Sequence, residues 1–312
     1  MKTLVLGGTG VAGRSLLPLL LQKGHETLAH VRSADNAGKA SHVEAHGAIP
    51  IHGDASDPAR LTSWTRGCDA VVDLRVSIPP ASRAAFAWAW RDYARLRDHA
   101  CGQVVDAAIA AGVPRVIRDT VTVVYADGGD LWLDETHPVQ ATGALAANLA
   151  AERHLARLTT AGGAGVAIRF GGFYGPADAF STEMITAART GRALMAGDPD
   201  GYTSATHTDD IGSALLVAFT APAGVYNAVD DEPMRRSTVL EILASSAGLD
   251  QVKPFPSWTA KVASSPMRAL ARSQRVSNHQ LKSLGWQPTV SSRRTGWPAA
   301  FAAQSRAQVH EA

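Results

Sequence analysis

The 312-residue sequence has few cysteines, few aromatic residues and no long apolar run. Its two cysteines, Cys68 and Cys101, lie far apart and outside any CxxC or Cys/His spacing, so neither a disulfide framework nor a metal site is predicted. A strand pattern begins at residue 2, which leaves no secretion signal, and no apolar run has the length of a membrane span. We therefore expect a cytoplasmic protein without membrane attachment.

The sequence also lacks local runs of residues with the same charge. The formal net charge is +2, and arginines and acidic residues are spread along the chain without a basic patch that would indicate nucleic acid. Hydrophobic residues make up 46% of the sequence, enough to form a full core in one large domain or two unequal ones. A small molecule is the expected partner.

From residue 2 to about residue 169, short apolar runs alternate with helix-length segments, which is typical of βαβ units on a parallel sheet. Strands are predicted at 2–6, 27–31, 48–52, 70–73, 115–119 and 165–169. Helices are predicted to begin at Val11, Pro58, Ala81 and Ala141, the first bent by Pro18 and the third running to Ala111, where Gly112 ends it.

After residue 175 this alternation weakens, and proline, tryptophan and arginine become frequent in short segments. The predicted fold is α/β, a Rossmann doubly wound parallel sheet with a smaller C-terminal substrate-binding lobe. We expect a Rossmann domain over residues 1–175, to which about 205–230 return, and a lobe over 176–312.

A glycine-rich turn directly follows the first strand and opens the first helix, with Gly7, Gly10 and Gly13 at GxxGxxG spacing. Such a turn lets pyrophosphate approach backbone N–H groups at a helix N-terminus, where the helix dipole favours negative charge. A turn that binds nothing is the alternative, but the strand before and the helix after favour a dinucleotide. The predicted contacts here are Gly7, Thr9, Gly10, Val11, Ala12, Gly13 and Arg14.

The second and third strands end in residues suited to the adenosine half of the cofactor. Arg32 stands where an acidic residue would accept from a free ribose 2′-OH, so NADP(H) is favoured, and Arg14 can join it at the 2′-phosphate or remain a solvated helix residue. Asp54, followed by Ala55, is placed to accept from the adenine amino group. Its alternative role, capping the next helix, suits Asp57 better.

Later stretches extend the pattern over nearly the whole chain. They are AGVPRVI at 111–117, VY at 124–125, DETHP at 134–138, IRFGGFYGP at 168–176, HTDDI at 207–211 and LGWQP at 284–288. With the glycine turn, they make the sequence resemble the extended and atypical short-chain dehydrogenase/reductases. The resemblance implies cofactor contacts from Leu74, Arg75, Thr120 and Asn148.

Members of that family usually use a Tyr, a Lys four residues later, a Ser or Thr, and an Asn for proton transfer and cofactor binding. In the register of the resemblance, Ala144 stands at the Tyr position and Asn148 at the Lys position. Val121 stands at the Ser/Thr position and Arg97 at the Asn position, and no Tyr occurs between Tyr125 and Tyr174. We therefore predict no catalytic residue. Because the chemistry of nucleotide-sugar epimerases and dehydratases depends on the Tyr-Lys pair, its absence argues against these two classes of enzyme.

Two interpretations remain. In the first, the protein is an NADPH-dependent ketoreductase, similar to the ketoreductases of antibiotic tailoring that lack this tetrad, and it reduces an aromatic polyketide whose own phenol or a water supplies the proton. In the second, it binds NADP(H) without turnover as a sensor or regulatory module. The resemblance is compatible with a monomer or with a homodimer formed through the long third helix.

Other candidates have two explanations each. Thr120 and Thr122 end the fifth strand, where either hydroxyl can hold a substrate oxygen, although strand propensity explains both. Arg75 can contact the cofactor or the substrate, although a surface orientation is more common. His207 is expected to cap a helix and link the lobes. The aromatics that can wall a flat pocket are Trp88, Trp90, Tyr93, Phe173, Tyr174, Phe255, Trp258 and Trp286, with Met267.

Overall fold

The computed structural model describes residues 1–31, 37–256 and 258–311. Its centre is a seven-stranded sheet with all neighbouring strands parallel, in the order β3-β2-β1-β4-β5-β7-β11. The strands are β1 (Lys2–Leu6), β2 (Glu26–Val31), β3 (Ile49–His52), β4 (Ala70–Asp73), β5 (Arg115–Val121), β7 (Ala164–Phe170) and β11 (Gly224–Ala228). This order, with its reversal between β1 and β4, confirms the Rossmann fold class.

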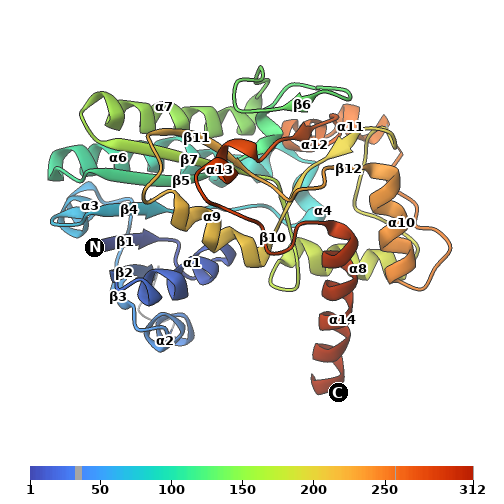
Figure 1. Ribbon diagram of the computed structural model, residues 1–312, viewed down its shortest axis with the longest axis horizontal. Coiled ribbons are helices and arrows are strands. Elements are labelled where there is room, and N and C mark those ends of the chain that lie inside the picture. Colours follow the sequence, from blue (N-terminus) through green and yellow to red (C-terminus); the bar gives the residue numbers. More distant parts are fainter. Residues whose placement is uncertain (32–36, 257, 312) are drawn as a thin grey trace.

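Helices cover both faces of the sheet (Figure 1). One face packs on α1 (Val11–Gln22), α2 (Ala37–Ala45) and α9 (Ile211–Val217), through leucines such as Leu16 and Leu215. The other packs on α3 (Pro58–Thr65), α6 (His99–Ala111) and α7 (Ala146–Thr160), through side chains such as Val104 and Leu155. Burial on both faces explains why the central strands are nearly continuous apolar runs.

The predicted strands agree with the structure to within two residues at each end, because short buried runs are bounded by clear turns. The single long helix predicted from Ala81 is wrong. The segment divides into α4 (Ala81–Ala84), a 3-10 turn η1 (Ala87–Trp90), α5 (Arg91–Arg97) and α6, and Asp98 interrupts the last two with φ −96° and ψ −80°. The left-handed Gly112, at φ 68°, ends α6 as predicted.

Two other helix predictions need correction. Helix α2 was not predicted, and α7 begins at Ala146 rather than Ala141, after a 3-10 turn η3 (Gly143–Leu145). Helix α1 continues through Pro18 to Gln22. Pro18 removes only one intrahelical hydrogen bond. The buried leucines on both sides of it hold the helix on the sheet, so the helix continues.

Most of the remaining elements gather beyond the carboxyl ends of the strands, the short helix at His279–Ser283 packs beside β11, and the last helix projects from the body (Figure 1). Helices α8 (Ala179–Arg189), α10 (Arg236–Ser246) and α14 (Arg293–Glu311) share an apolar core of their own. The short strands are β6 (Trp132–Leu133), β8 (Gly172–Tyr174), β9 (Tyr202–Thr203), β10 (Ala205–His207), β12 (Met234–Arg235) and β13 (Arg275–Val276). The short helices are α11 (Trp258–Val262), α12 (Ser265–Leu270) and α13 (His279–Ser283), with 3-10 turns η2 (Thr122–Val124) and η4 (Thr208–Asp210). Over the described ranges, no helix combines the length and apolar character that a membrane crossing requires.

Candidate cofactor site

The glycine turn lies between β1 and α1 at the carboxyl edge of the sheet. Gly7 has a φ of 86°, and a Cβ there would lie 2.8 Å from the carbonyl carbon of Leu74. The Gly10 N–H donates to the Gly7 carbonyl at 3.1 Å and closes the turn. A side chain at position 7 would strain the backbone and collide with the chain leaving β4, so the fold itself requires this glycine.

Gly13 and Gly10 differ in what a side chain would meet. A Cβ at Gly13 would lie 2.4 Å from the carbonyl carbon of Gly8, so this glycine lets α1 pack closely on the turn. A Cβ at Gly10 would meet only the Gly7 carbonyl oxygen, at 3.4 Å, which is ordinary contact. Packing of the protein does not demand glycine at position 10, whereas close approach of a phosphate would.

Helix α1 begins at Val11 without a side-chain cap. The Arg14 N–H is the first to bond back, to the Gly10 carbonyl at 2.9 Å, so the N–H groups of Val11, Ala12 and Gly13 have no acceptor within the helix. These donors and the positive end of the helix dipole suit an anion. The turn therefore fits the pyrophosphate of a dinucleotide.

Arg75, which follows β4, directs its guanidinium into the protein and is not on the surface. Its Nε donates to Asp73 Oδ1 at 2.8 Å, one Nη donates to the Ala55 carbonyl at 3.0 Å and the other to the Ala100 carbonyl at 3.1 Å. Only 11% of the side chain is exposed. The guanidinium thus ties the end of β4 to the loop after β3, and the main chain of Leu74 and Arg75 borders the glycine turn.

Asp73 is fully buried between two arginines. Its Oδ2 lies 2.7 Å from Nη1 of Arg118, which projects from β5 and is also completely buried. Burial alone would raise the pKa of the Asp73 carboxyl, but Arg118 and Arg75 hold it below its usual range. The Arg118 guanidinium also donates to the main-chain carbonyls of Asp73, Arg75 and Leu96. This ion-paired cluster fixes the chain directly beneath the glycine turn.

The residues predicted for the adenosine half lie partly within the described structure. Asp54 is exposed, and its Oδ1 accepts from the Ser56 N–H at 2.8 Å, which lowers the pKa of the carboxyl below its usual range. Asp57, as expected, caps α3 by accepting from Ala59 N–H. Arg14 is exposed and its Nη1 donates to the Thr9 carbonyl at 3.1 Å. Arg32 lies outside the described residues.

Thr120 and Asn148 are both buried, and their polar groups have partners inside the protein. The Thr120 hydroxyl donates to Glu152 Oε1 at 3.3 Å, and Glu152 is also paired with Arg169, Nη2 to Oε2, at 2.7 Å. Asn148 Nδ2 donates to the Tyr93 hydroxyl at 2.9 Å and to the Leu145 carbonyl at 3.1 Å. Since an amide has two N–H groups, Asn148 has no donor left for a ribose.

Tyr93 was not predicted beside Asn148, because it lies on α5, 55 residues before Asn148 in the sequence. Its side chain packs with Trp90, and Ala144 and Met267 pack against the same cluster. Apolar groups from α5 and α12 therefore surround the position where the resemblance places a tyrosine. The sequence also has no lysine between Lys39 and Lys253.

A second buried ion pair, between Arg97 and Asp119, lies beside Tyr93. Arg97 Nη2 lies 2.7 Å from Asp119 Oδ2, another Arg97 nitrogen donates to the Asp119 carbonyl, and its guanidinium lies 5.4 Å from the ring centre of Tyr93. Strand β5 was expected to be apolar but contains the polar residues Arg118, Asp119 and Thr120. This departure from the apolar pattern indicates that these side chains have buried partners. A single sequence does not show which residues they meet.

His207 acts as a cap, as expected. Its Nδ1 accepts from the Asp209 N–H at 3.3 Å at the start of η4, and its ring meets Tyr174 edge-on at 5.1 Å. Strand β10, which it ends, pairs with β8. The residue therefore links segments on either side of α8 and serves the fold.

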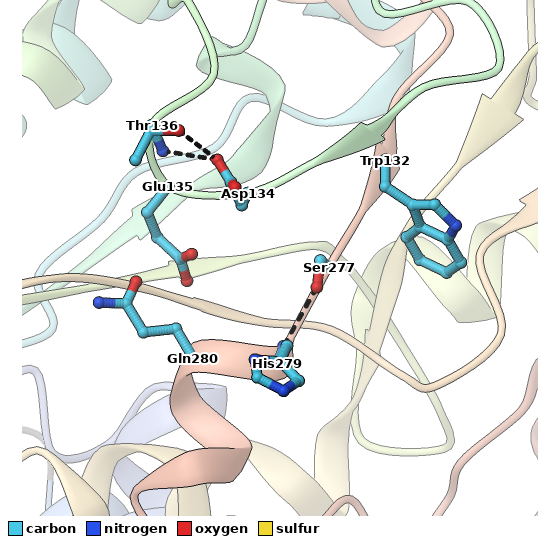
Figure 2. A pocket seen from close by; sticks show the side chains of 7 residues that line it. All are labelled: Trp132, Asp134, Glu135, Thr136, Ser277, His279 and Gln280. Carbon is cyan, nitrogen blue, oxygen red and sulfur yellow. Dashed lines mark hydrogen bonds between the residues drawn. The ribbon is translucent and has the colours of Figure 1, made fainter.

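A surface pocket of about 470 Å³ lies away from the glycine turn, between β6 and α13 (Figure 2). It is lined by Trp132, Asp134, Glu135, Thr136, Ser277, His279 and Gln280. Glu135 accepts from the Asn227 N–H of β11 at 2.7 Å, and burial raises the pKa of its carboxyl. None of these residues is among those predicted to bind cofactor, so the pocket is separate from the candidate cofactor site.

Comparison with known proteins gives matches over most of the chain. The family model described as NAD(P)H-binding matches residues 7–174. A 3-diazoavenalumate denitrifying reductase from a Streptomyces species is 29% identical over 307 residues, covering 95% of this chain and 99% of that protein. The 4-hydroxy-2-methyl-3-oxo-4-farnesyl-3,4-dihydroquinoline-1-oxide ketoreductase of Stigmatella aurantiaca is 30% identical over 271 residues, covering 84% of this chain and 78% of that protein.

Solved structures share the fold at lower identity. The UDP-glucose 4-epimerase of Thermotoga maritima, in its complex with UDP-glucose, superposes with a TM-score of 0.80 at 18% identity, over 99% of this chain and all of that chain. At this identity the likeness shows a common fold and no common reaction.

Proposed function

Because the chain belongs to the NAD(P)H-binding family of Rossmann-type, short-chain-dehydrogenase-like proteins, we propose that it is a ketoreductase of antibiotic tailoring. It reduces a carbonyl of a bulky aromatic polyketide, of the angucyclinone kind, as the angucyclinone ketoreductase of simocyclinone biosynthesis does. The observation that carries this proposal is the similarity to a ketoreductase over most of both chains. The similarity to a second reductase over nearly the full length supports it.

The proposed cofactor is NADP(H). Val11, Ala12 and Gly13 offer their N–H groups to the pyrophosphate, and Arg14 and Arg32 bind the 2′-phosphate. Arg14 supports this assignment because, among the described residues, only one of its guanidinium nitrogens is engaged, with the Thr9 carbonyl of the turn. When bound, the cofactor supplies the hydride for the carbonyl carbon.

The proposed adenine and nicotinamide contacts follow the same edge of the sheet. Asp54 keeps one carboxylate oxygen without a hydrogen bond to Ser56 and offers it to the adenine amino group, beside Ala55. Leu74 and Arg75 border the ribose through their main chain. Thr120 and Asn148 act from beneath the surface, holding the ends of β5 and α7 in place.

We assign the substrate to the side of the lobe, residues 176–312, which faces these strand ends. Helix α12 comes so close to η3 that a Cβ on Gly143 would lie 2.5 Å from Ser265 Oγ. Phe86 and Trp88, both more than half exposed, stack with ring centres 6.2 Å apart in the segment that follows Arg75. Exposed stacked rings are suited to a flat aromatic ligand.

The proton for the carbonyl oxygen comes from the substrate or from water. The chain offers neither a tyrosine at position 144 nor a lysine at 148. A phenol beside the carbonyl can hydrogen-bond to the oxygen that becomes an alkoxide and can protonate it, while the protein contributes orientation.

The test is oxidation of NADPH by the purified full chain with polycyclic ketones, in matched pairs with and without a phenol beside the carbonyl. Turnover of the phenol-bearing member of each pair is the expected result. Binding of NADPH without turnover of any ketone would instead favour the alternative, a non-catalytic sensor. Equal turnover of both members would overturn substrate assistance and leave the reductase.

A further inference from the structure

Three polar side chains lie around the first turn of α14, where Tyr174 approaches Gly296 and Asp230 approaches Arg293. Tyr174 ends β8, Asp230 follows β11 by two residues, and Arg293 is the first residue of α14. They are only 2%, 2% and 4% exposed, respectively. The three residues therefore come from segments far apart in the sequence and are all buried beside the start of α14.

These groups lack hydrogen-bond partners among the described residues. The Tyr174 hydroxyl, both carboxylate oxygens of Asp230 and Nε of Arg293 have none. Arg293 Nε lies 3.7 Å from Asp230 Oδ2, too far for a direct hydrogen bond. The other guanidinium nitrogens are used, because Nη1 and Nη2 donate to Thr203 at 2.7 and 2.6 Å.

The hydroxyl of Tyr174 lies beside the first turn of α14. A Cβ on Gly296 would lie 2.9 Å from this oxygen, and the Tyr174 ring is 5.6 Å from that of Trp297. Trp297 Nε1 is likewise buried and without a partner within the described structure. Burial, followed by the charge of Asp230, raises the pKa of the Tyr174 hydroxyl.

A buried carboxylate with neither oxygen hydrogen-bonded is very unfavourable, and so is a buried unpaired hydroxyl. A water molecule is the occupant that fits, because it can accept from Arg293 Nε and donate to Asp230 while bridging a distance too long for direct contact. We propose that Tyr174, Asp230 and Arg293 enclose a buried hydration site whose water fastens the C-terminal helix to the edge of the sheet.

This site is independent of the cofactor turn and of the proposed reaction. It joins the end of β8, the end of β11 and the start of α14, none of which carries a residue assigned to NADP(H). Burial raises the pKa of Asp230 to about 7, despite the opposing effect of Arg293, which agrees with a carboxyl group that lacks direct hydrogen bonds from the protein.

A crystal structure of the full chain at high resolution tests the proposal directly. We expect density for a water within hydrogen-bond distance of Asp230, of Arg293 Nε and of the Tyr174 hydroxyl. Direct hydrogen bonds among these groups, with no density between them, would overturn it.

Thermal unfolding gives a second measurement. Tyr174→Phe should lower Tm by about 2 °C, since it removes one partner of the water. Tyr226→Phe is the matched control, because the Tyr226 hydroxyl has a direct acceptor in the Pro222 carbonyl, at 3.0 Å. A Tm that is unchanged or higher in Tyr174→Phe would mean that the hydroxyl has no partner in solution and would contradict the proposal.

Discussion

At the scale of single residues, the proposed preference for NADP(H) depends on two arginines, Arg14 and Arg32. Arg32→Ala should weaken NADPH binding at least tenfold and leave NADH binding nearly unchanged, because only NADPH carries the 2′-phosphate. Titration of both cofactors by fluorescence measures the two dissociation constants. Arg294→Ala is a suitable control, since Arg294 is 57% exposed on α14, pairs with Glu232 at 3.0 Å and belongs to no segment assigned to the cofactor. Equal losses for both cofactors would refute the assignment of Arg32.

Three other residues test whether the chain has a side-chain acid. Asn148→Ala and Thr120→Ala should keep kcat within a few-fold, because both side chains are already bonded inside the protein, to Tyr93 and Glu152. The same is expected of Thr122→Ala. Steady-state kinetics with separately measured NADPH affinity provides the comparison. A large fall in kcat at unchanged affinity would identify a catalytic residue.

Tyr93→Phe probes the buried pair from its other side. The change leaves the Asn148 amide with one fewer partner in a buried place, which should cost about 1–2 kcal/mol of unfolding free energy. Chemical denaturation measures this loss. If Tyr93 only supports α7, kcat at saturating substrate should hardly change. A fall in kcat under conditions where the variant remains fully folded would show instead that the phenol acts on the substrate.

At the scale of elements, the turn between β1 and α1 gives a matched pair of variants. Gly10→Ala should fold normally and bind NADPH at least tenfold more weakly, because its Cβ would make only ordinary contact within the protein and would stand in the path of the proposed pyrophosphate. Gly13→Ala should instead lower Tm, since its Cβ would lie 2.4 Å from Gly8. Unfolding curves and NADPH titration of both variants separate the two effects, and weakened folding in Gly10→Ala would contradict this division of roles.

The same turn shows what the sequence can predict about the fold and the site. Local chemistry places the turn, the strands and the cap at Asp57, because glycine spacing, apolar runs and a capping residue act over a few positions. The division of the 81–111 segment at Asp98 was missed, because its helical pattern continues across the break. The inward orientation of Arg75 was also missed, since it depends on Asp73, Ala55 and Ala100 together.

The predicted cofactor residues illustrate the same limit. Gly7, Leu74 and Arg75 meet at one edge because parallel strands end together, which the alternating pattern already implies. The partner of Asn148 was not predictable from spacing, because Tyr93 is 55 residues away on another helix. Buried polar groups find partners through tertiary packing, so a single sequence indicates that a partner must exist without naming it.

At the scale of the whole molecule, Asp230 should make stability depend on pH. Its pKa in the folded protein is about 7, against an ordinary value of 3.8, so the folded state holds a proton that the unfolded chain releases between these two values. Stability should therefore fall as pH rises from about 4 to about 7 and level off above, by at most on the order of 4 kcal/mol from this group. The charges that act on it are Arg293, Glu232, Asp231 and Asp210.

Asp230→Asn tests this dependence, because the amide keeps the shape of the side chain and does not ionise. Denaturation of the wild-type chain and the variant at several pH values should show the variant gaining stability relative to wild type as pH rises from 4 to 7. Asp92→Asn, at a carboxylate that is 69% exposed on α5, should follow the wild-type curve throughout. If the difference between Asp230→Asn and wild type is constant over this range, Asp230 is ionised at both ends of it, and Arg293 outweighs the burial of the carboxylate.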